Sequence, residues 1–134
     1  MFKSIKSYKK HFRGRFKSTT KGISVRFGDL GLAALQSNRI SEATLNAVKN
    51  FFKKAMKDKG KLYVRISPDF SITKKPLKMK MGAGCGKFES LYSYVKSGKV
   101  LFEISGIERL ETLKLFRIAQ DKLPFKCVIL ENRI

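Results

Sequence analysis

Five lysines and three glycines stand together between Lys74 and Lys87, in the segment KKPLKMKMGAGCGK, which contains no acidic residue. Lysine ammonium groups bind phosphate and carboxylate oxygens, whereas an unpaired ammonium buried in a core costs on the order of several kcal/mol. The alternate glycines, Gly82, Gly84 and Gly86, allow backbone conformations closed to other residues and let a partner approach the main chain. We call residues 74–87 the finger, and we expect it to be a flexible cationic loop that contacts an anionic partner.

The finger matches neither of the common nucleotide-binding motifs. A phosphate-binding loop needs a glycine five positions before its last glycine, where Met81 stands, and a serine or threonine after the lysine, where Phe88 stands. The dinucleotide pattern G-x-G-x-x-G fails because the third glycine comes one residue early. Both nucleotide-binding interpretations are therefore excluded.

The net charge of +20 over 134 residues is concentrated in one part of the chain. Residues 1–88 contain 22 Lys/Arg and four acidic residues, a net charge of +18. Residues 89–134 contain eight Lys/Arg and six acidic residues, a net charge of only +2. This asymmetry indicates a polyanion-binding face, and the 43% hydrophobic content is typical of a folded domain rather than a disordered tail.

Three kinds of polyanion can bind such a face: nucleic acid, an acidic membrane and an acidic protein. No segment approaches the roughly 18 apolar residues that a membrane span requires. The basic residues are expected mostly in loops, whereas peripheral membrane binding favours a basic amphipathic helix. Nucleic acid is therefore the favoured partner, and no membrane partner, cofactor or homo-oligomer is expected.

Few residues are suited to catalysis or metal binding. His11 is the only histidine, and the local sequence supports no Ser/His/Asp or Cys/His set. Cys85 and Cys127 are too few and too far apart for a disulfide framework or a zinc site, and Cys127 is expected in the core. The chain is therefore predicted not to be an enzyme and to hold no metal.

Hydrophobic patterning predicts the elements that position the finger. Strands are expected at 23–27, 61–66, 88–95, 99–104 and 125–131, and helices at 41–59 and 107–123. Residues 96–98 predict a hairpin between the third and fourth of these strands. The predicted fold is α+β, a mainly antiparallel sheet with two helices packed on one side. Residues 1–22 are expected to form an extended basic arm, and residues 23–134 a single domain.

Two basic segments allow more than one interpretation. The first twenty residues contain no acid and fit either a mitochondrial presequence or a permanent RNA-binding arm, and composition leaves both open. Lys49, Lys53 and Lys57 line one face of the first predicted helix. Solvation and RNA contact are about equally compatible with that face.

Short segments throughout the chain resemble one known family when they are taken in order and with their spacing. They are YKKHFRGR (8–15), VRFG (25–28), GL (31–32), GKLYVRI (60–66), PD (68–69), ITKKPL (72–77), MGAGCG (81–86), GKVLFE (98–103) and KLPFK (122–126). The chain resembles the large-subunit ribosomal protein L-sixteen family, the universal family shared with the archaeal and eukaryotic L-ten-e proteins. Each segment is a weak signal by itself, and the ordered set is a strong one.

The resemblance implies a structural protein of the large ribosomal subunit that binds large-subunit rRNA and helps to shape the aminoacyl-tRNA site near the peptidyl-transferase region. Its partners would be large-subunit rRNA, tRNA in the A/P region and neighbouring ribosomal proteins. The resemblance also favours a permanent arm over a presequence, because residues 9–15 align with the mature N-terminus of the family. A free nucleic-acid-binding regulatory protein is the alternative function.

Two groups of binding residues follow from the resemblance. Arginine can hold a phosphate through two hydrogen bonds, and lysine supplies a point charge. The residues expected to bind rRNA are Lys9, Lys10, Arg13, Arg15, Lys17, Lys21, Arg26, Arg65, Lys74 and Lys75. The residues expected in the tRNA-proximal loop are Lys78, Lys80, Met81, Gly82, Gly84, Gly86 and Lys87.

The finger departs from the bacterial pattern of the family at three positions. Lys80 stands where many bacterial members have an arginine, and Ala83 and Cys85 replace residues that are often Lys or Ser. A lysine lacks the planar fork of arginine, so the arginine contact is not carried over. Together with a composition rich in Lys, Phe, Ile and Asn, these departures favour a mitochondrial ribosome encoded by the organelle genome, with the bacterial cytoplasm as the alternative.

Overall fold

The computed structural model describes residues 24–57, 59–82 and 84–132, which form seven strands and two helices. The elements are β1 Leu30–Ala34, β2 Asn38–Ser41, α1 Glu42–Met56, β3 Lys61–Val64, β4 Phe70–Lys74, β5 Lys87–Val95, β6 Val100–Ser105, α2 Arg109–Asp121 and β7 Cys127–Glu131. All strand pairings among the described residues are antiparallel, so the predicted α+β class is confirmed. The predicted arm, residues 1–22, lies outside the described residues.

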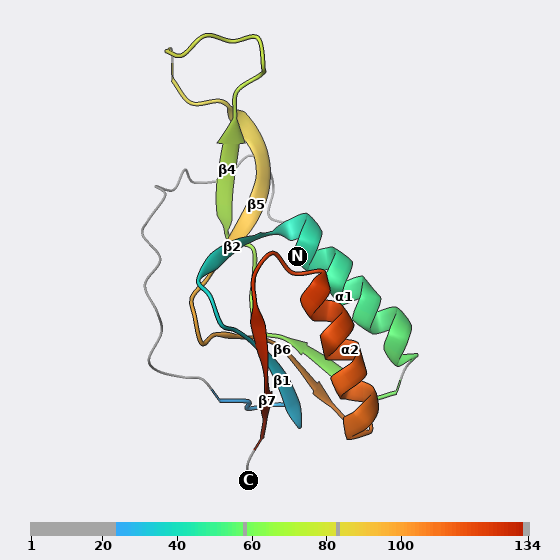
Figure 1. The fold of residues 1–134 in the computed structure, drawn as a ribbon. Coiled ribbons are helices and arrows are strands. Elements are labelled where there is room, and N and C mark those ends of the chain that lie inside the picture. The colour runs from blue at the N-terminus through green and yellow to red at the C-terminus, as the bar shows by residue number, and fades with distance from the viewer. Residues whose placement is uncertain (1–23, 58, 83, 133–134) are drawn as a thin grey trace.

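The strands form two sheets rather than one. A four-stranded sheet has the order β3-β6-β1-β7, and a three-stranded sheet has the order β2-β5-β4. Both helices lie on the same side of the four-stranded sheet, while β4 and β5 extend away from it (Figure 1). The body of the molecule is therefore the four-stranded sheet with its helices, and the three-stranded sheet carries the finger.

The two sheets share one continuous antiparallel ribbon. Ala33 pairs with Val100 in the first sheet and Asn38 pairs with Val95 in the second. Between them the chain bends, and the Gly98 N–H donates to the Ala34 carbonyl at 2.7 Å. The predicted hairpin between 88–95 and 99–104 is therefore wrong. Residues 96–99 do form a turn, in which the Lys99 N–H donates to the Lys96 carbonyl at 3.1 Å, but this turn does not pair β5 with β6. The two strands pair instead with β2 and β1, which belong to different sheets.

Helix α1 begins where the sequence predicts and buries one face against the sheet. The Ser41 side chain accepts a hydrogen bond from the Thr44 N–H at 3.1 Å, which caps the first turn. Phe52 is fully buried, with its ring centroid 5.3 Å from that of Phe102 and 5.8 Å from that of Phe116. These three rings join α1, β6 and α2. The core of the body therefore lies between the helices and the four-stranded sheet.

Three local predictions are wrong. Residues 24–29 are irregular rather than a strand, and the first strand is β1. Phe70–Lys74 is a strand that the sequence interpretation missed, and its pairing with β5 builds the stalk of the finger. The helical spacing of Leu110 with Leu113 and Phe116 predicts that Leu110 is buried in α2, but it is 63% exposed. Thr112 is buried instead, and its hydroxyl donates to the Glu108 carbonyl at 3.0 Å. Because that hydrogen bond satisfies the hydroxyl group, the threonine can be buried at a position where an apolar side chain is expected.

Candidate nucleic-acid interface

The finger is the loop of a β-hairpin. β4 and β5 pair as far as Lys74 opposite Lys87, and residues 75–86 connect them. The loop lies at the far end of this hairpin, away from the helices and the body (Figure 1). A narrow two-stranded stalk can enter a space inside folded RNA that the body of a domain cannot enter.

Hydrogen bonds within the finger limit its freedom. The Lys75 ammonium donates to the Gly82 carbonyl at 2.6 Å across the loop, and the Met79 N–H donates to the Pro76 carbonyl at 3.1 Å. Gly82 and Gly84 have φ of 127° and 87°, which side chains rarely adopt, as the alternate glycines predict. Gly86 is required for a different reason, namely space, because a Cβ there would overlap the Lys74 backbone. The base of the loop is therefore closely packed.

The cations of the finger fall into two sets. Lys75 is tied to the loop, and Lys74 forms an exposed ion pair with Glu89 at 3.3 Å. Lys78, Lys80 and Lys87 are exposed, and none of their side chains has a hydrogen bond or ion pair to another described residue. This second set is open to an external anion.

Apolar side chains alternate with Lys78 and Lys80 at the tip of the loop. Leu77 and Met81 are fully exposed, and Met79 is 64% exposed. An exposed apolar cluster at the end of a projecting loop is typical of a contact surface rather than of a solvated loop. The tip therefore combines point charges with flexible apolar side chains, which suits contact with both phosphates and the faces of bases.

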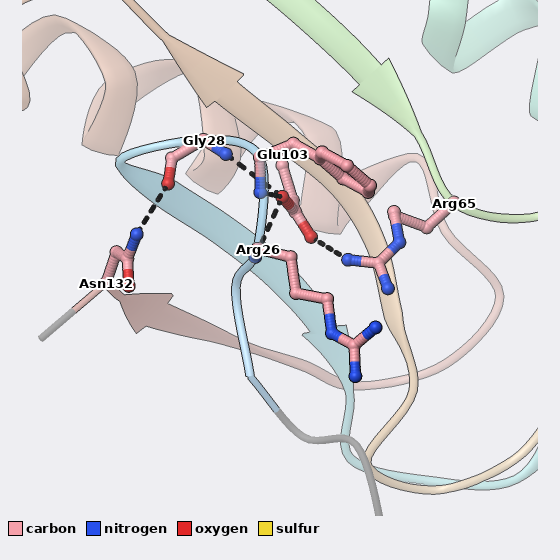
Figure 2. Close-up of polar contacts among 6 residues, drawn as sticks. Arg26, Gly28, Arg65, Glu103 and Asn132 are labelled. Carbon is pink, nitrogen blue, oxygen red and sulfur yellow. Dashed lines mark hydrogen bonds and ion pairs between the residues drawn. The ribbon is translucent and has the colours of Figure 1, made fainter. Parts of the chain in front are cut away.

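A second group of predicted residues surrounds one buried carboxylate in the body. Glu103 of β6 is fully buried, and its Oε2 accepts backbone N–H bonds from Arg26 at 3.2 Å, Phe27 at 2.7 Å and Gly28 at 3.0 Å. Its Oε1 pairs with the Arg65 guanidinium. Figure 2 shows these bonds converging on the carboxylate. We call these five residues the Glu103 cluster.

The position of Glu103 explains why an acid can be buried here. Its neighbour Phe102 faces the helices, and successive side chains of a strand point to opposite faces, so Glu103 lies on the other face. There the irregular segment 25–28 crosses the sheet. A Cβ on Gly31 would meet the Val25 side chain at 2.7 Å, so a glycine is required for this close crossing. The segment thus covers the carboxylate and supplies its donors.

The hydrogen bonds of the cluster keep Glu103 ionised. Burial by itself raises the pKa of this carboxyl group, but the N–H groups of Phe27, Gly28 and Arg26 and the Arg65 guanidinium together lower the pKa below its ordinary value. Its folded pKa is therefore lower than its unfolded pKa. The resulting stability is present above the unfolded pKa and is lost as the pH falls through the folded pKa.

We therefore expect an acid-dependent loss of stability that depends on Glu103. The free energy of unfolding should decrease as the pH falls through 4.5, the ordinary value, and further through the lowered pKa. Denaturant unfolding at a series of pH values would measure this decrease. The Glu103→Gln variant should show a shallower decrease over the same range, and an identical pH profile in the two proteins would contradict the assignment.

The predicted arginines have different surroundings in this cluster. Arg65 pairs with Glu103, its side chain is 24% exposed, and its guanidinium carbon lies 5.1 Å from the centroid of the Phe27 ring. The Arg26 side chain is exposed and runs away from the carboxylate that its own N–H contacts (Figure 2). Arg26 is thus the more accessible of the two for a phosphate.

Six of the predicted rRNA-binding residues lie outside the described residues, namely Lys9, Lys10, Arg13, Arg15, Lys17 and Lys21. The other predicted residues form two separate sites, the finger and the Glu103 cluster. Sequence interpretation assigned no role to Glu103 or Phe27. The available signal was an acidic residue inside the otherwise apolar strand sequence VLFEI, which indicates a buried and fully paired carboxylate.

The cysteines and acids form no metal site in the part of the chain that the structure describes, where no three His, Cys, Asp or Glu side chains cluster. Cys127 is half-buried against the core, and burial raises the pKa of its thiol to about 12. Cys85 is exposed in the finger. Neither described helix has the length and apolar character needed to cross a membrane.

Comparison with known proteins identifies the family. Residues 3–130 match the family described as ribosomal protein L16p/L10e. The chain belongs to this family. A protein named large ribosomal subunit protein uL16c from Cyanidium caldarium is 40% identical over 126 residues, 93% of this chain and 90% of its relative.

Two relatives named large ribosomal subunit protein uL16 extend this similarity. The Thermus thermophilus protein is 40% identical over 93% of this chain and 89% of its own length. The Coxiella burnetii protein is 36% identical over 98% of this chain and 96% of its own length. The L16p/L10e family is one of ribosomal proteins rather than of enzymes, and the predicted family is confirmed.

Proposed function

We propose that the chain is a structural protein of the large ribosomal subunit that binds large-subunit rRNA through its cationic half. Family membership, relatives named as large-subunit proteins and the net charge of +18 in residues 1–88 support this function. Cationic residues that neutralise phosphates release counterions, so the affinity for RNA should fall steeply with salt. Its other partners would be neighbouring ribosomal proteins.

The finger is the observation that carries the finer proposal. It presents Lys78, Lys80 and Lys87 together with exposed Leu77, Met79 and Met81 at the end of a narrow hairpin. We propose that this loop borders the aminoacyl-tRNA site near the peptidyl-transferase region. The basic arm, residues 1–22, is proposed to follow rRNA and tRNA in the same region.

Sedimentation of the endogenous protein tests the ribosomal assignment. The protein should be recovered with large subunits and whole ribosomes at moderate salt and should be released only at high salt, because its contacts are largely ionic. A tagged ribosomal protein of the small subunit provides the control for co-sedimentation of intact ribosomes. Recovery of the protein in fractions lighter than large subunits at moderate salt would refute the proposal.

A free nucleic-acid-binding regulatory protein is the second candidate, because the high positive charge alone suits it as well. The two functions differ in ligand preference. A regulator should bind a DNA duplex with sequence preference, whereas the proposed ribosomal protein should prefer folded large-subunit rRNA over duplex DNA of equal length. Competition binding with both ligands at one salt concentration distinguishes them.

We propose that the ribosome concerned is mitochondrial, with a bacterial ribosome as the alternative. The composition rich in Lys, Phe, Ile and Asn and the presence of Lys80 rather than arginine in the finger support the organellar assignment. Fractionation of source cells followed by detection of the protein in purified mitochondria tests it. Recovery solely with ribosomes of another compartment would favour the alternative.

A further inference from the structure

Phe27 is an unusually exposed aromatic side chain. It is 59% exposed, and it is the only aromatic residue among the strongly exposed large hydrophobic side chains of the described residues. The other members of that set are Leu35, Leu77, Met79, Met81, Leu110, Ile118 and Val128. An exposed aromatic ring beside basic side chains is typical of surfaces on which nucleobases stack.

The Phe27 ring is also held in a defined position. Its own N–H donates to the buried Glu103 carboxylate at 2.7 Å, which fixes the backbone. Its ring stacks on Tyr63, with centroids 5.7 Å apart and an angle of 27° between the planes. The Arg65 guanidinium contacts the same ring at 5.1 Å. Because these contacts exist before any partner arrives, little side-chain freedom remains to be lost on binding.

The surroundings of the ring are cationic. Arg26 precedes Phe27 and is exposed, and its side chain has no ion pair with another described residue. The Glu103 carboxylate is paired with Arg65 and buried, so it presents no free negative charge at this surface. A partner at this site therefore meets an aromatic face beside an unpaired guanidinium.

We propose that Phe27, Tyr63 and Arg26 form a stacking site for one unpaired nucleobase of the large-subunit rRNA. The exposed face of Phe27 would stack on the base, with Tyr63 supporting the ring, and Arg26 would contact a phosphate of the same or the adjacent nucleotide. Aromatic side chains flanked by cations are how proteins hold single-stranded bases, and every base has a face that can stack. This inference rests on the proposed binding of large-subunit rRNA.

Photocrosslinking tests the contact directly. The full chain bound to a transcript of the large-subunit rRNA from the same genome is irradiated with ultraviolet light, digested and analysed by mass spectrometry. A nucleotide adduct on Phe27 or Tyr63 is expected. Adducts confined to the finger and the arm, with the RNA bound, would overturn this inference and leave the proposed function intact. If the wild-type chain does not bind the transcript at all, the proposed function itself fails.

Two substitutions of Phe27 measure its contribution. Phe27→Leu keeps an apolar side chain but removes the aromatic face, and it should weaken binding of the transcript roughly tenfold. Phe27→Tyr keeps the face and should bind within about twofold of wild type. The slope of log affinity against log salt should be unchanged in both, whereas Arg26→Ala should reduce that slope by about one.

The outcomes of the binding series separate stacking from a purely structural role. The circular dichroism spectrum and the thermal midpoint of Phe27→Leu show whether this variant is folded. If it is not folded, the binding of Phe27→Tyr and the crosslinks of the wild-type chain still test the inference. Equal binding by wild type and Phe27→Leu would overturn the inference. Crosslinks from Phe27 to a neighbouring protein in assembled subunits would also overturn it, because that protein would then be the partner.

Discussion

Replacing Glu103 by alanine is expected to lower the free energy of unfolding by about 3 kcal/mol, the largest stability effect that we predict for a single substitution. The carboxylate accepts N–H bonds from three consecutive residues, 26–28, and pairs with Arg65. Each buried donor that loses its acceptor costs about 1–3 kcal/mol. Arg65 is partly exposed, so water can solvate its guanidinium and it adds little to the loss. Denaturant unfolding of the purified chain measures the effect.

Two variants control this experiment. Glu131→Ala removes the acidic partner of an exposed ion pair with Arg109, and it should change the free energy of unfolding by no more than about 1 kcal/mol. Glu103→Gln keeps an acceptor oxygen without the charge and should fall between the two alanine variants. Equal stability of the Glu103→Ala and Glu131→Ala proteins would show that the Glu103 cluster does not stabilise the fold.

Replacing Lys78, Lys80 and Lys87 together by alanine is expected to weaken rRNA binding by about a hundredfold near 0.1 M salt. Each phosphate contact contributes about 0.7–0.9 to the slope of log affinity against log salt, so the loss of three contacts should reduce the slope by about two. The fold should be unaffected, because all three side chains are exposed. Filter binding across a salt series, with thermal unfolding of the free protein, measures both quantities.

The matched control is the triple variant Lys96→Ala, Lys114→Ala and Lys126→Ala, which removes the same charge from exposed positions outside the finger. If general electrostatic attraction explained binding, the two triple variants would lose affinity equally. Our proposal requires a much larger loss in the finger variant. Unfolding of the finger variant as a free protein would show instead that the finger is part of the structural core.

Local signals in the sequence predicted much of the body of the fold. Ser41 caps the first helix through a local hydrogen bond. Pro124 stands just after the second helix, which its ring cannot continue. The helical spacing of Val48, Phe51, Phe52, Ala55 and Met56 predicts an apolar face for α1, and this prediction holds only in part. Phe52 and Met56 are buried as expected, whereas Ala55 is exposed, because a small side chain at the border of the face contributes little to packing.

The long-range pairing of strands could not be predicted from local patterns. Gly98 in a Lys-Ser-Gly turn resembles a hairpin signal, yet its N–H bonds to Ala34, which lies more than sixty residues earlier. The Glu103 cluster was missed for a related reason. Its donors come from residues 26–28, and only the folded sheet brings them to the carboxylate. The exposure of Lys78, Lys80 and Lys87 was predicted correctly because exposure and charge are local properties.

The strand order also has a consequence for how the chain folds during translation. Strands β1 to β4 have no pairing with one another among the described residues, since each pairs with β5, β6 or β7. Leu30 of β1, for example, pairs with Ile104 and Glu131. A nascent chain must therefore release most of its length before any sheet can close. Such high contact order is typical of slow folding, and the cationic half would leave the exit tunnel well before its own strands find their partners.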